Sequence, residues 1–112
     1  MSTFMENEGN WEKTVKADTL KVIQHYKEKE GIQVFGMYGM CWGGEIAFLA
    51  GTQLPDIRVI GALHAFGLTL ESMREVKVPA VLMPAGEDPD LVKYTLRIFH
   101  VYSSRFFMVH HK

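Results

Sequence analysis

The sequence of 112 residues has one cysteine, almost no net charge and no long uninterrupted apolar run. One cysteine cannot close an internal disulfide, so the cysteine content does not indicate secretion. A net charge of −1 gives no electrostatic reason to expect nucleic acid or an anionic membrane as partner. The longest apolar stretch, residues 34–51, contains Glu45 and five glycines, which argues against a membrane span.

Basic residues are also missing from the first ten positions, so the sequence there lacks the charged start of a signal peptide. We therefore expect a soluble, cytoplasmic protein with no membrane partner. The five histidines do not follow the spacing of a metal site, and we expect neither a metal nor another cofactor.

Helical and apolar segments alternate along the chain and predict a single α/β domain over residues 1–112. Residues 1–9 are polar and expected to be loose. Asn10 is expected to cap a helix that ends at Gly31. This order predicts a mainly parallel sheet flanked by helices, with right-handed crossovers. The expected helices are 11–30, 45–50, 71–75 and 91–102, and the expected strands are 32–37, 57–63, 78–83 and 106–109.

A sharp step from strand to helix is predicted around the only cysteine, in Gly39-Met40-Cys41-Trp42-Gly43. This pattern is typical of a nucleophile elbow, a tight turn that needs small residues two before and two after its apex. The helix start favours a negative charge and hence the thiolate, and the Trp42 N–H could stabilise an oxyanion. The alternative is a small buried cysteine packed beside glycines.

Polar residues follow several of the expected strands and could complete a catalytic triad. Asp88 is the candidate acid and His110 the candidate base, with His111 as an alternative base. His64 could line the site. Because the carboxyl ends of parallel strands share one edge of a sheet, these residues are expected to converge there. Alternatively, Asp88 forms a turn and His110 belongs to a polar tail.

Three segments, residues 36–44, 61–67 and 78–88, resemble the dienelactone hydrolase family of α/β-hydrolases. The resemblance implies a partial α/β-hydrolase fold, a cysteine nucleophile and a small-molecule ester or lactone substrate. It also implies that the chain corresponds to the C-terminal part of such an enzyme. The strands before the first helix, and the loop that supplies a second oxyanion donor, have no counterpart here. We therefore expect a truncated member of the family.

Two functions of different classes follow from these observations. The first is hydrolysis of ester, thioester or lactone bonds by Cys41, with Asp88 and His110 completing the triad. The second is a catalytically inactive remnant that acts as a binding or interaction module. An open sheet edge, left where upstream strands are missing, would then allow self-association.

Overall fold

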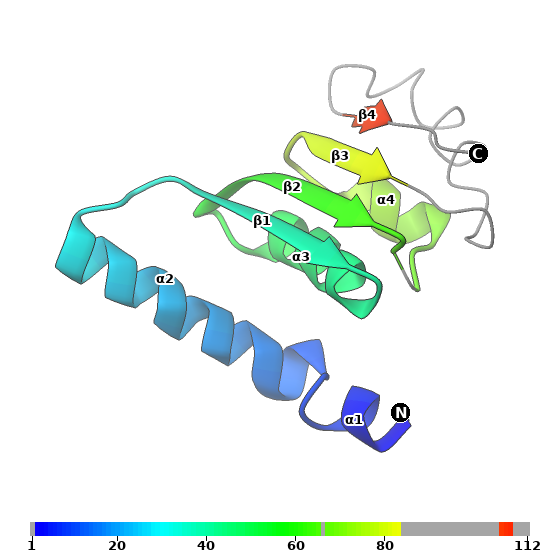
Figure 1. The fold of residues 1–112 in the computed structure, drawn as a ribbon, viewed down its shortest axis with the longest axis horizontal. Helices are drawn as coiled ribbons and strands as arrows, with labels where there is room; N and C mark the ends of the chain where they lie inside the picture. The colour runs from blue at the N-terminus through cyan, green and yellow to red at the C-terminus, as the bar shows by residue number, and fades with distance from the viewer. Residues whose placement is uncertain (1, 66, 84–105, 109–112) are drawn as a thin grey trace. The chain divides into compact units, whose positions relative to one another are not determined.

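A computed structural model of the chain describes residues 2–65, 67–83 and 106–108 (Figure 1). The chain divides into two compact units, Met1–Phe35 and Gly36–Lys112, which are described separately. The single domain expected over residues 1–112 stays a prediction. Within the described residues, every helix is too short or too polar to cross a membrane.

The first unit is helical and consists of α1 (Ser2–Glu6), a π-helical turn η1 (Trp11–Val15) and α2 (Lys16–Glu30). The predicted ends are confirmed. The Asn10 side chain accepts a hydrogen bond from the Lys13 N–H at 2.9 Å, and Gly31 ends α2 with a left-handed φ of 67°. The expectation that residues 1–9 are loose is wrong, because α1 forms there and the Asn7 N–H donates to the Thr3 carbonyl at 3.1 Å.

Apolar residues recur at helical spacing along η1 and α2, but they are buried only in part. Trp11 and Ile23 are buried, whereas Val22 and Tyr26 are 56% and 43% exposed. Helical spacing therefore located the helix correctly but overestimated how much of its apolar face is covered.

The second unit holds a four-stranded sheet whose order is β1-β2-β3-β4. Strand β2 runs parallel to β3, and β3 runs parallel to β4, with Ile60 beside Ala80 and Ala80 beside Phe106. The predicted parallel α/β architecture is therefore confirmed. The elements are β1 (Phe35–Met40), α3 (Trp42–Gln53), β2 (Ile57–Leu63), α4 (Leu70–Glu75), β3 (Ala80–Met83) and β4 (Phe106–Met108).

Some element bounds differ from those expected. Strand β1 begins three residues later than predicted and runs up to the turn at Cys41. Helix α3 continues past Gly51, where glycine allows close packing, since a Cβ there would lie 3.0 Å from side-chain atoms of Ile60 and Val76. The helix ends at Gln53, and Leu54 is extended as expected for a residue that precedes proline. The helix expected over residues 91–102 lies outside the described residues.

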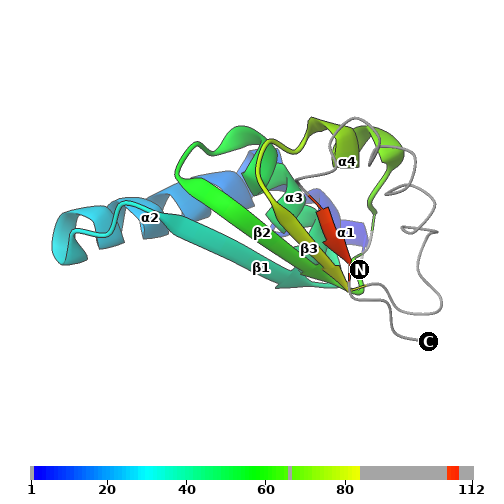
Figure 2. The ribbon, with the colours of Figure 1, turned by 90° about the horizontal axis from the view of Figure 1, so that it is seen from above.

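The two faces of the sheet differ in how far they are covered. Figures 1 and 2 show α3 and α4 on the same side of the sheet, where Ile60, Ala80 and Leu82 are almost fully buried. The opposite side, called here the open face, carries apolar side chains that are 36–60% exposed. They are Tyr38, Met40, Val59, Val81 and Met83.

Candidate active site

Cys41 occupies the sharp turn between β1 and α3. Its φ of 55° and ψ of −119° lie in a region that residues with a side chain rarely adopt. Such a conformation costs about 1–3 kcal/mol and persists where the surrounding packing enforces it. The thiol is free and exposed, so a reactant could reach it. The backbone therefore has the form expected of a nucleophile elbow.

Glycine is needed on one side of this turn. A Cβ at Gly39 would overlap the Gly43 carbonyl, so β1 approaches the first turn of α3 without room for a side chain. A Cβ at Gly43 would meet none of the described residues within 4 Å. The expectation that the residue two positions after the nucleophile must also be small is therefore wrong here, since Gly43 contributes only its backbone to the close approach. The next residue, Gly44, packs against Ala65, whose Cβ would lie 2.8 Å from an added one.

Hydrogen bonds align the carboxyl ends of three strands. The Cys41 N–H donates to the Leu63 carbonyl at 2.9 Å, and the His64 N–H donates to the Met83 carbonyl at 2.9 Å. Cys41 and His64 therefore follow neighbouring strands at one edge of the sheet, as expected. His64 is exposed and has a positive φ of 50°.

The other predicted members of the triad are not placed. Asp88, His110 and His111 lie outside the described residues, and their catalytic roles stay predictions. Trp42, the predicted oxyanion donor, is the first residue of α3, where backbone N–H groups point towards the start of the helix. Within the part of the chain that the structure describes, no cluster of three His, Cys, Asp or Glu side chains could hold a metal ion.

Glu45 lies near the elbow, and the sequence alone gave this residue no role. It lies in the first turn of α3, and its Oε2 would be 2.6 Å from a Cβ added at Gly67. Gly67, with a φ of 81°, belongs to the loop that follows β2. Burial raises the pKa of the Glu45 carboxyl above its ordinary value. The signal in the sequence was an acid four residues after the nucleophile in an otherwise apolar helix.

Comparison with known proteins agrees with this geometry. The model of the dienelactone hydrolase family matches residues 1–100, and the chain belongs to that family. It is 32% identical over 90 residues to an "Endo-1,3;1,4-beta-D-glucanase" of Zea mays, covering 80% of this chain and 29% of that protein. It is 28% identical over 88 residues to a "Putative carboxymethylenebutenolidase" of Saccharolobus solfataricus, covering 76% of this chain and 33% of that protein. The chain thus spans about a third of these relatives. No solved structure matches significantly.

The two glycines that flank Cys41 provide a matched test of the elbow. We expect Gly39→Ala to destabilise the protein by about 1–3 kcal/mol or more, because its methyl group would overlap the Gly43 backbone. Gly43→Ala should be neutral or slightly stabilising, because its methyl group meets open space and alanine favours a helix. Urea unfolding of both variants measures the difference. Equal destabilisation by the two substitutions would contradict the described packing.

Replacing Glu45 with glutamine tests the effect of its burial. Because burial penalises the carboxylate, the folded protein holds this proton more tightly than the unfolded chain does. The contribution of Glu45 to stability is therefore most favourable at acidic pH and is lost as the pH rises from about 4.5 through the raised folded pKa. Glu45→Gln should remove this loss. The difference in Tm between this variant and the wild type should be larger at pH 7 than at pH 4. These two pH values are chosen to bracket the titration of Glu45.

The control for this experiment is Glu8→Gln, which alters an exposed glutamate in the turn that follows α1. Its Tm difference from the wild type should change little between the two pH values. A Glu45→Gln variant that behaves like this control would show that burial of Glu45 has no effect on stability.

Proposed function

We propose that this chain is a hydrolase of ester, thioester or lactone bonds with Cys41 as its nucleophile. The observation that carries the proposal is the backbone of Cys41, a positive-φ residue between a parallel strand and a helix, with its thiol exposed. Membership of the dienelactone hydrolase family supports the same class of reaction. The chain spans about a third of the length of its relatives, so the activities of those longer proteins are not assigned to it.

The proposed reaction proceeds through an acyl-enzyme. The Cys41 thiolate attacks the carbonyl carbon, and the displaced electron pair forms an oxyanion that the Trp42 N–H stabilises. The oxyanion collapses, and the alcohol or thiol leaves with a proton from His110. Water, deprotonated by His110, then attacks the thioester carbonyl, and collapse of this second intermediate releases the acid and regenerates the Cys41 thiolate. In this scheme Asp88 orients His110.

The names of the two relatives point to different bonds. One is named as a glucanase and the other as a carboxymethylenebutenolidase. Hydrolysis of a glycosidic bond is usually carried out by two carboxyl groups that flank it. Among the described residues around the elbow, Glu45 supplies a single carboxyl group. An exposed thiol at a strained turn, by contrast, suits acyl transfer. We therefore favour an ester, thioester or lactone over a glycoside.

Hydrolysis of p-nitrophenyl acetate by the wild type and by Cys41→Ala tests this proposal. We expect the variant to lose activity by a factor on the order of 10³ or more, because the nucleophile is gone. Intact-mass analysis should show an acetyl group on the wild type and none on the variant. Circular dichroism checks that Cys41→Ala remains folded. Equal rates for the two proteins would rule out Cys41 as the nucleophile.

The open face favours a second candidate function, an interaction module that binds a second copy of the chain. Strand β1 lies at one end of the described sheet, and its sequence, Phe-Gly-Met-Tyr-Gly-Met, carries no charge. Tyr38 and Met40 on that strand are both 60% exposed. A face without charge does not repel its own copy, and an edge strand can pair with an identical strand.

A lysine on the open face tests this second candidate. Tyr38→Lys should shift the protein towards the monomer, because the pairing of two copies would place two like charges on an apolar surface. Val22→Lys is the matched control, since it changes an apolar residue of α2 that is 56% exposed. Analytical ultracentrifugation over a range of concentrations gives the oligomeric state. A wild type that is monomeric throughout would exclude this function.

A further inference from the structure

His64 follows β2, the strand that lies between β1 and β3 in the sheet. Figures 1 and 2 show these three strands side by side, with their carboxyl ends at one edge of the sheet. The Leu63 carbonyl accepts from the Cys41 N–H, and the Met83 carbonyl accepts from the His64 N–H, both at 2.9 Å. Because neighbouring strands lie about 5 Å apart, the backbone of His64 lies roughly one strand spacing from the proposed nucleophile.

The backbone at His64 is unusual and is held by its surroundings. Its φ of 50° is uncommon for a residue with a side chain, and such conformations are concentrated at functional sites. Ala65 in the same loop is only 1% exposed, and Gly67 lies against the Glu45 carboxyl group of α3. The His64 side chain itself is exposed, as is the Cys41 thiol. A firmly packed loop thus carries an exposed imidazole next to the turn that holds the thiol.

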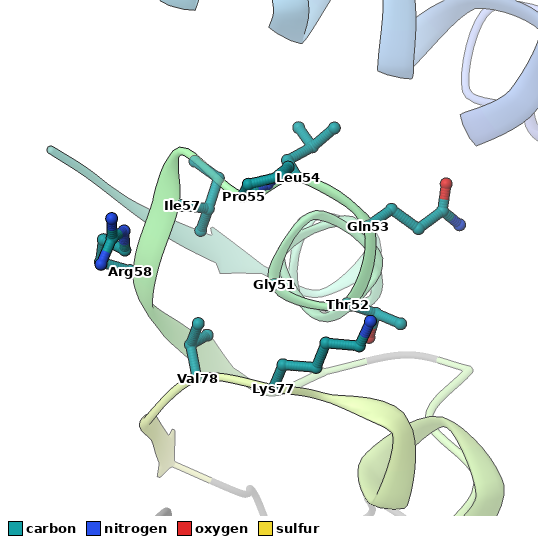
Figure 3. Close-up of a pocket in the computed structure, with 9 residues that line it drawn as sticks. All are labelled: Gly51, Thr52, Gln53, Leu54, Pro55, Ile57, Arg58, Lys77 and Val78. Carbon is teal, nitrogen blue, oxygen red and sulfur yellow. The ribbon is translucent and has the colours of Figure 1, made fainter. Parts of the chain in front are cut away.

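A cavity of about 380 Å³ lies at the other end of the same strand (Figure 3). It is lined by the last turn of α3 and by the first residues of β2, Ile57 and Arg58. The seven residues of β2 place it about 20 Å from His64. A substrate that Cys41 attacks therefore contacts the carboxyl edge of the sheet, where His64 lies, rather than this cavity.

The strand order indicates which part of an ester would face His64. Trp42, the proposed oxyanion donor, begins α3, whereas Asp88, the proposed acid, follows β3 in the sequence. The proposed base must contact both that acid and the leaving group. The leaving group would therefore lie on the β3 side of Cys41. Strand β2, which leads directly into His64, is the next strand on that side.

We propose that His64 is a further catalytic residue, which donates a hydrogen bond to the oxygen of the leaving group. When the tetrahedral intermediate collapses, the carbon–oxygen bond breaks and its electron pair passes to that oxygen. The hydrogen bond from His64 stabilises this negative charge, and His110 supplies the proton that completes the alcohol. An imidazole has two nitrogens, so one can be held by the protein while the other donates to the substrate. The inference rests on the proposed hydrolase function.

Two acetate esters that differ in their leaving group test this proposal. Phenolate keeps most of its negative charge on the oxygen, whereas p-nitrophenolate spreads the charge over the nitro group and needs less stabilisation. His64→Gly removes the donor and suits the positive φ. We expect it to lower kcat/KM about tenfold for phenyl acetate and less than about threefold for p-nitrophenyl acetate, because one hydrogen bond to a charged oxygen is lost. His64→Asn keeps an N–H donor and should recover part of the rate with phenyl acetate.

The control is His25→Ala, which removes an exposed histidine of α2 and should hydrolyse both esters as the wild type does. Intact-mass analysis separates this inference from the function on which it rests. A wild type that gains no acetyl group would overturn both the hydrolase function and the role of His64. If the wild type is acetylated, equal slowing of the two esters by His64→Gly would indicate a purely structural role and overturn the inference alone. Unchanged rates for both esters would do the same.

Discussion

The close approach of Gly39 to the Gly43 carbonyl is the contact on which the second unit depends. It forces the chain to turn within one residue, which places Cys41 at a positive φ and directs α3 back along the sheet. Helix α3 then buries Phe48 almost completely over β2. Burial of one such side chain contributes about 1.5–3 kcal/mol, comparable to the cost of the strained turn. Packing of the helix thus offsets the strain at the thiol.

Local patterns predicted much of this fold. Strand β2 was predicted with its observed bounds, because an apolar run follows the turn at Pro55 and Asp56 and ends at a histidine. The bounds of α3 were missed because Gly51 stops an isolated helix, but here it permits close packing against Ile60. The exposure of Val22 could not be anticipated, since periodicity shows that a face is apolar but not whether another element covers it.

The candidate site was predictable where it depends on local backbone geometry. Cys41 and Gly39 were identified because an elbow has a characteristic spacing of small residues. The approach of Glu45 to Gly67 was missed because these residues are distant in the sequence and meet only when α3 packs on the loop after β2. The positive φ of His64 had no sequence signal beyond the modest tolerance of histidine for that conformation.

The open face also determines how the chain should respond to temperature and salt. Its side chains are apolar, and the chain has a net charge of only −1, so electrostatic repulsion between copies is weak. Attraction between apolar surfaces strengthens on warming and is little affected by moderate ionic strength. If copies of the chain associate through this face, as the second proposed function holds, cooling would separate them, whereas a moderate change of ionic strength would have little effect.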